Sequence, residues 1–227
     1  MQVPAAARSL ANEDHMALWN GSSGNDLVDW STHPLDGTGD TGHAMYGFGG
    51  DDQIKGSDTL TNIIDGGTGN DRVIGGNVSD ILLGGDGNDE YQIRISDAGI
   101  DTVADDLSAS DSPGLGGGTS DYIHVLDSAG STLMLYRNGN DLLVTNAADA
   151  ADGAINSGAS IYHFFLGGNN VIEYAIGSDG NGYNLTTLLS PSPSARPALT
   201  TEHAPVSFDG HELQQVHALP LQHDLLV

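Results

Sequence analysis

The segment Gly66–Ile74 reads GGTGNDRVI and decides how this chain folds, because it is one copy of a nine-residue repeat. A second full copy, Gly84–Gln92, reads GGDGNDEYQ. Both copies fit the pattern G-G-x-G-x-D-x-U-x, in which U is a large apolar residue. A fixed period of this kind indicates a solenoid built from stacked units.

The copies around these two units are incomplete. Gly75–Leu83 keeps the aspartate but lacks the third glycine, whereas Gly56–Ile64 has Thr61 at the aspartate position and is followed by one extra residue, Asp65. Further copies lie upstream, namely Gly47–Lys55, the isolated unit Gly21–Asp29 and the degenerate stretch Asp36–Asp40. The sequence therefore predicts a solenoid whose units are of unequal quality.

The spacing inside each unit has a physical reason. Glycines in the first six residues supply the backbone angles and close approach that a tight turn needs, and the last three residues form a short strand. Two units then make one coil, so successive units alternate between two sides of a parallel β-roll. The eighth residue of each unit points inward, which predicts an apolar column of Ile54, Ile63, Val73, Leu82 and Tyr91.

Stacked turns bring backbone carbonyls and aspartate carboxylates together around a gap. Such hard oxygen ligands favour Ca²⁺. Asp52, Asp71 and Asp89 fall on one side of the coil, where we expect two calcium ions, whereas Asp80 faces Thr61 on the other, weaker side. The candidate metal-binding residues are Asp26, Gly47, Gly49, Asp52, Gly66, Gly67, Gly69, Asp71, Gly75, Gly76, Asp80, Gly84, Gly85, Gly87 and Asp89.

The composition supports a cation as partner. The chain has 227 residues with 31 acidic and 6 basic side chains, a formal charge of −25. This charge argues against nucleic acid, which is bound by Lys and Arg, and against anionic membranes. Cysteine is absent, so stability has to come from a core or a metal. The first residues lack the pattern of a secretory signal peptide, and no apolar stretch is long enough for a transmembrane helix.

Residues 93–190 are predicted to be β-rich. The turn Asn138–Asp141 joins two apolar segments and predicts a hairpin. A second pair of strands is expected over Ile161–Leu166 and Val171–Ile176. The Ser- and Pro-rich stretch after residue 190 reads as a linker.

The repeats resemble those of the RTX family of secreted bacterial proteins. The resemblance covers about residues 21–92, with core repeats at 47–92, and implies a calcium-binding parallel β-roll. Arg137–Val144 is similar to a signature of the mainly antiparallel region, here 93–190, that caps the roll in that family. The last four residues, Asp224–Val227, resemble the C-terminal signal of type I secretion substrates. They end a tail at 191–227, and residues 1–20 form an N-terminal flank before the repeats.

This resemblance implies an extracellular module that folds on binding calcium after export by the type I secretion machinery. No catalytic site is expected within the chain, because His211-Glu212 lacks the second histidine of the zinc-protease motif at the required spacing. Alternatives remain open: the chain belongs to a secreted protease, lipase or polysaccharide-modifying enzyme with an upstream catalytic domain, or to an adhesin or surface-layer protein. The sequence leaves the oligomeric state open.

Overall fold

A computed structural model describes residues 16–31, 41–105 and 117–189, together with 207–208, 211–212, 214–216 and 218–220. These residues are mostly β, in agreement with the all-β class predicted from the sequence. The helices among them are short 3-10 turns, namely Gly130–Thr132, Asp149–Asp152, Phe164–Leu166, Gly168–Asn170 and Leu185–Leu188. Within these ranges no helix has the length and apolar character needed to span a bilayer.

The strands form two large mixed sheets and one small one. The first sheet contains, in spatial order, β1 (Met16–Asn20), β3 (Gly42–Tyr46), β5 (Thr61–Thr68), β7 (Ile81–Asp86), β9 (Gly99–Ala104), β13 (Ser157–Ile161), β12 (Asp141–Asn146), β11 (Leu133–Asn138) and β18 (Gln214–Val216). The second contains β19 (Leu219–Pro220), β15 (Gly182–Asn184), β14 (Tyr174–Gly177), β10 (Tyr122–Val125), β8 (Glu90–Ile93), β6 (Arg72–Ile74), β4 (Gln53–Lys55) and β2 (Leu27–Asp29). The small sheet pairs β16 (Ser207–Phe208) with β17 (His211–Glu212).

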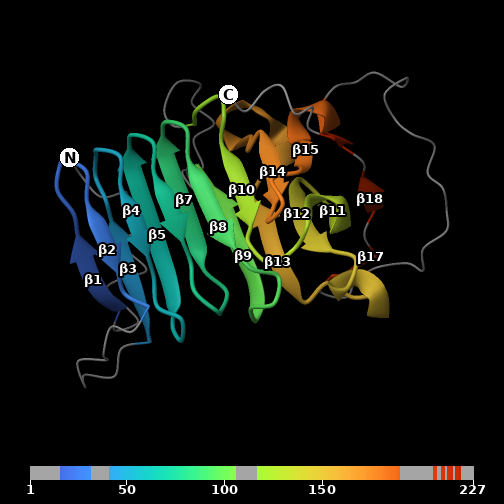
Figure 1. Cartoon of the computed structure of the whole chain (residues 1–227), viewed down its shortest axis with the longest axis horizontal. Coiled ribbons are helices and arrows are strands. Elements are labelled where there is room, and N and C mark those ends of the chain that lie inside the picture. Colours follow the sequence, from blue (N-terminus) through green and yellow to red (C-terminus); the bar gives the residue numbers. More distant parts are fainter. Residues whose placement is uncertain are drawn as a thin grey trace.

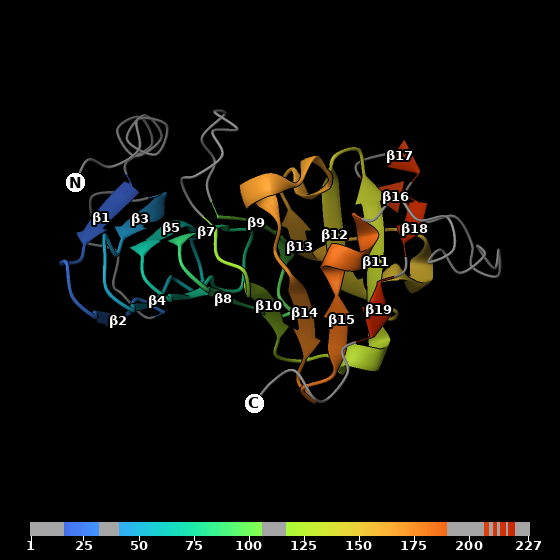
Figure 2. The ribbon, with the colours of Figure 1, turned by 90° about the horizontal axis from the view of Figure 1, so that it is seen from above.

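The chain coils between the two large sheets. Odd-numbered strands up to β9 lie in the first sheet, and the even-numbered strands from β2 to β8 lie in the second. Figure 1 shows these strands side by side along the long axis, and Figure 2 shows the two rows facing each other from above. Neighbours within each row pair in parallel, as they must when each coil repeats the direction of the last.

The core is a double column of apolar side chains between the two rows. One column comes from the first sheet and consists of Met45, Ile64, Leu82, Val103 and Ile161, which are paired neighbours. The other comes from the second sheet and consists of Ile54, Val73, Tyr91, Ile123 and Ala175. All are buried in one cluster. Fully burying one side chain of this size contributes about 1.5–3 kcal/mol, so the column supplies much of the stability that short strands lack.

One inward residue was predicted wrongly. The sequence pattern placed Ile63 in the column, but Ile64 pairs with Leu82 and lies in the cluster, while Ile63 pairs with Ile81. The extra residue of this unit therefore lies within its turn and not behind its strand. Because side chains alternate along a strand, a shift of one residue exchanges the two faces.

Parallel stacking continues beyond residue 92. β9 pairs in parallel with β13, and β10 pairs in parallel with both β8 and β14. Antiparallel pairing begins at β12 and β11, whose hairpin has the predicted turn between Asn138 and Asp141. The second predicted pair is wrong, because β13 ends at Ile161, a 3-10 turn follows, and β13 and β14 belong to different sheets.

The C-terminal region adds a strand to each large sheet. β18 pairs with β11 in the first sheet, and β19 pairs with β15 in the second. Both additions cover sheet edges that would otherwise present unpaired backbone groups. The linker after residue 190, the degenerate repeat Asp36–Asp40 and the terminal Asp224–Val227 lie outside the described residues.

Candidate metal-binding edge

Acidic side chains line one edge of the coil, at the position just before each strand of the second sheet. The strand register places them in consecutive coils, about 4.7–4.9 Å apart in the pairing direction. We call this row the acidic edge, and it consists of Asp26, Asp52, Asp71, Asp89, Asp121 and Glu173.

A ladder of hydrogen bonds connects these residues. The backbone N–H of Asp52 donates to Oδ1 of Asp71 at 2.7 Å, and the N–H of Asp71 donates to Oδ1 of Asp89 at 2.7 Å. The same bond joins Asp26 to Asp52, Asp89 to Asp121, and Asp121 to the Glu173 carboxylate. One oxygen of each acceptor is thus fixed by the turn one coil earlier, which leaves the second oxygen to be accounted for.

The second oxygen has no partner in the three middle turns. Oδ2 of Asp52, Asp71 and Asp89 is buried without a hydrogen-bond donor. A buried carboxylate oxygen is normally satisfied, and leaving it bare carries a large desolvation cost. These three oxygens therefore call for a proton or a cation.

Backbone conformation explains why a donor is missing there. The second residue of these turns has positive φ, with 72° at Phe48, 104° at Gly67 and 97° at Gly85. Where the second residue does not have positive φ, its N–H reaches the carboxylate, as Ser22 does for Asp26 at 2.6 Å. In these three turns the left-handed second residue therefore does not donate its N–H to Oδ2. Glycine, which stands there in two of them, adopts that conformation at little cost.

Glycine at the first position leaves room beside the open oxygen. A Cβ at Gly47 would meet Oδ2 of Asp52 and the carbonyl oxygen of Gly66 in the next turn. A Cβ at Gly66 or Gly84 would likewise meet Oδ2 of the aspartate in its own turn. Carboxylate and carbonyl oxygens from adjacent turns thus border one small space, a donor set that suits calcium.

Burial raises the pKa of these carboxyl groups. The pKa of Asp71 rises to about 7 and that of Asp89 to about 8, because desolvation outweighs the backbone hydrogen bonds and neighbouring aspartates add repulsion. The pKa of Asp52 is also raised, again by burial first. Without a cation, burial therefore disfavours the charged forms of Asp52, Asp71 and Asp89.

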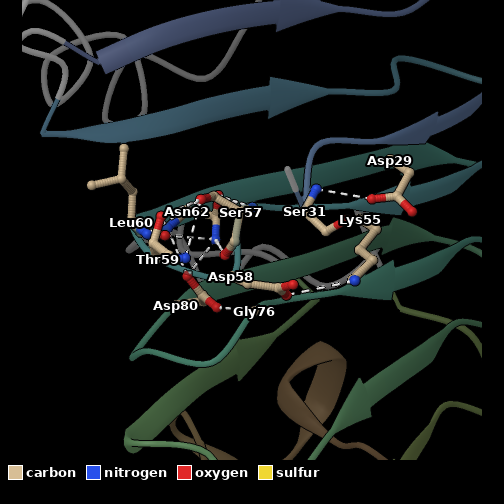
Figure 3. A network of polar contacts seen from close by, with 10 residues as sticks. All are labelled: Asp29, Ser31, Lys55, Ser57, Asp58, Thr59, Leu60, Asn62, Gly76 and Asp80. Carbon is tan, nitrogen blue, oxygen red and sulfur yellow. Dashed lines mark hydrogen bonds and ion pairs between the residues drawn. The ribbon is translucent and has the colours of Figure 1, made fainter. Parts of the chain in front are cut away.

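On the opposite edge, an amide side chain donates hydrogen bonds to the buried aspartate. Asn62 stands at the position of the aspartate, not Thr61 as the sequence pattern suggested, and its Nδ2 donates to Oδ1 of Asp80 at 2.8 Å (Figure 3). The same Nδ2 donates to the carbonyl oxygens of Ser57 and Leu60 at 3.0 and 2.9 Å. Oδ2 of Asp80 accepts from the N–H of Gly76 at 2.7 Å. Both oxygens of Asp80 are therefore satisfied.

The predicted ligand residues divide between these two edges. The acidic edge contains four of the predicted aspartates, namely Asp26, Asp52, Asp71 and Asp89. The first position of its turns is occupied by Gly47, Gly66 and Gly84. The second position is occupied by Gly67 and Gly85, and the fourth by Gly69 and Gly87. Gly49 faces the Thr68 side chain beside this edge. Gly75, Gly76 and Asp80 lie on the opposite edge.

Two acidic-edge residues, Asp121 and Glu173, were not among the residues predicted from the sequence, and neither was Asp105. Asp121 precedes β10 and accepts from the N–H of Asp89 at 2.7 Å, although the stretch GGGTSDYIH at 116–124 keeps four positions of the repeat and was a readable signal. Asp105 has no such signal. Together Asp89, Asp105 and Asp121 place one carboxylate oxygen each within 4.8 Å of the others, a group that could hold a metal ion.

Comparisons with known proteins do not identify the function of the acidic edge. No protein-family model matches the chain, and no curated protein matches it. The inference about function therefore rests on the residues of the chain itself.

Proposed function

We propose that this chain is a calcium-binding module of the RTX type. In this proposal the coil from β1 to β8 is a parallel β-roll, and the mainly antiparallel strands after it close the end of the roll. The observation that carries the proposal is the set of buried, unpartnered Oδ2 atoms of Asp52, Asp71 and Asp89 beside glycine-lined spaces.

Calcium, when bound between turns, would supply the positive charge that these oxygens lack. The chain supplies the rest. Oδ1 of Asp71 and of Asp89 accepts from the N–H of the aspartate one coil earlier, and the first-position glycines keep the space beside Oδ2 free of a side chain. The left-handed second residue, Phe48, Gly67 or Gly85, does not donate a competing N–H to Oδ2. Each of these features serves cation binding better than it serves a metal-free turn.

The same features support a folding switch. The formal charge of −25 opposes a compact state, and the thirty-two glycines add backbone entropy that folding must overcome. Binding that occurs only in the folded state lowers its free energy by mass action. We therefore propose that the chain stays open where calcium is scarce and folds where calcium is millimolar.

Such a switch fits export before folding. We propose that the chain leaves a bacterial cell by the type I route, guided by the C-terminal Asp224–Val227, and works outside the cell as a calcium-stabilised part of a secreted protein. Secretion of the full chain compared with a variant in which Leu225, Leu226 and Val227 are replaced by Ser tests this step. Equal export of both proteins would contradict it.

Circular dichroism of the full chain tests the central proposal. In chelator we expect a spectrum of a largely unfolded chain, and titration with calcium to a few millimolar should produce a cooperative β signal. Magnesium at the same concentration serves as the control, because it prefers stricter octahedral geometry and holds its water. An unchanged spectrum with calcium, together with no heat of binding, would reject the proposal.

A further inference from the structure

The turn after β9 differs from the repeat turns of the acidic edge, which begin at Gly47, Gly66 and Gly84, in its first residue. Leu83 pairs with Ala104, so Asp105 stands in the register position at which Gly84 begins the preceding turn. Gly66 holds the corresponding position one coil earlier. A carboxylate thus replaces the first-position glycine in this turn, although the repeat pattern requires no side chain there.

Asp105 is buried with only half of its carboxylate satisfied. Its exposed fraction is 2%. The Tyr91 hydroxyl donates to its Oδ1 at 2.7 Å, whereas its Oδ2 is buried without a hydrogen-bond partner. The chain therefore positions one oxygen firmly through Tyr91 and leaves the other without a donor, an arrangement that favours a cation at the open oxygen.

Two further carboxylates meet Asp105 from the neighbouring turns. One oxygen each from Asp89, Asp105 and Asp121 lies within 4.8 Å of the other two. Oδ2 of Asp89 is buried and unpartnered as well. Glu173, whose carboxylate accepts from the N–H of Asp121 at 2.9 Å, adds negative charge at the same end of the edge. Both oxygens of Asp121 accept backbone N–H groups, from Asp89 and from Gly118. The two oxygens without a partner are therefore those of Asp89 and Asp105.

We propose that Asp89, Asp105 and Asp121 hold a calcium ion of their own at the junction between the repeats and the following strands. The inference rests on the proposed function in that the ion is taken to be calcium. Calcium affinity rises with the number of charged ligands. A gap between two repeats offers two aspartates, whereas the junction offers three, so the junction is filled at the lowest calcium concentration.

The position of the junction gives this ion a structural role. Asp89 precedes β8, Asp105 follows β9, and Asp121 precedes β10. An ion shared by these residues ties strands of both sheets together and fixes β10 beside β8, with which it pairs in parallel. The junction ion therefore orders the end of the coil on which the repeat turns stack.

Isothermal titration calorimetry with calcium and Asp105→Asn tests the site. The amide keeps an acceptor for Tyr91, and its Nδ2 can donate to neighbouring carboxylates as Asn62 does on the opposite edge, so we expect the variant to fold. It should bind one ion fewer, with loss of the tightest step. Asp58→Asn, which removes only a half-exposed ion-pair partner of Lys55, is the charge-matched control and should keep every ion.

The outcomes separate the two proposals. If the wild-type chain binds no calcium, the proposed function fails and this inference fails with it. If the wild-type chain binds calcium and Asp105→Asn retains the same number of ions and the same tightest step, only the junction site is rejected.

Terbium luminescence provides a readout that does not depend on the folding of an Asp105 variant. The Tyr91 hydroxyl is hydrogen-bonded to Asp105. A terbium ion at the junction therefore lies close to the Tyr91 ring and is excited by energy transfer from it. We expect the emission from the first equivalent of terbium to fall at least twofold in Tyr91→Phe, and to stay unchanged in Tyr162→Phe, whose ring stacks on His163. Equal emission from the wild type and Tyr91→Phe would overturn the assignment.

Discussion

The two turn edges of the coil differ in the hydrogen-bond partners of their buried aspartate oxygens. On the acidic edge, Asp71 has one oxygen bonded to a backbone N–H and the other buried without a partner. On the opposite edge, Asp80 receives donors at both oxygens, from Asn62 and from Gly76. An aspartate in the repeat position therefore does not by itself define a metal site, because a neighbouring amide can donate hydrogen bonds to the oxygen that would otherwise need a cation.

The largest expected difference concerns calcium affinity after Asp71→Asn. Asp71 borders the gaps on both of its sides, so the loss of its charge weakens two ligand sets. We expect the apparent affinity to fall about 10- to 100-fold, or about 1.4–2.8 kcal/mol, measured by calorimetric titration. An affinity within twofold of the wild type would contradict the assignment of the acidic edge.

Asp80→Asn is the matched change on the opposite edge and should act on stability instead. The new amide cannot accept from both Asn62 and Gly76 with the two oxygens of a carboxylate. We expect calcium-saturated protein to lose about 1–3 kcal/mol in urea unfolding, with the number of bound ions unchanged. Loss of an ion would show that both edges bind calcium.

The pH dependence of the calcium-free chain separates the acidic edge from ordinary surface carboxylates. The pKa values of Asp71 and Asp89 are raised by burial to about 7 and about 8, so the calcium-free fold holds protons at these groups that the open chain does not hold. Because these folded pKa values exceed the unfolded ones, the stability of the calcium-free fold falls as pH rises from about 4 to about 8. In chelator, the β signal in circular dichroism should therefore be larger at about pH 5 than at about pH 8, and Asp71→Asn should reduce the difference. An equal β signal at both pH values would contradict this account.

The smallest effect is expected at a carboxylate outside both edges. Asp58 makes a 3.5 Å ion pair with Lys55, and both side chains are partly exposed. Asp58→Asn should change the unfolding free energy by less than about 1 kcal/mol and leave the calcium titration unaltered. A large effect would mean that overall charge, and not the position of each aspartate, controls folding.

Much of the coil could be predicted from the repeat alone. Four of the five expected inward residues, Ile54, Val73, Leu82 and Tyr91, are fully buried, because period and apolar position together fix which side of a strand faces the core. The fifth failed because the extra residue of its unit lies in the turn. Turn length is set by packing against the neighbouring coil, which a pattern of glycines does not encode.

The candidate site divides in the same way. The acidic edge from Asp52 to Asp89 was predictable, since nine-residue spacing and two units per coil place these side chains in one row. Two contacts emerge only in the folded chain: Asn62 satisfies Asp80, and Asp105, from outside the repeats, meets Asp89 and Asp121. These contacts join residues that share no period, and they arise because the coil brings turns together across distances in sequence that vary with each insertion.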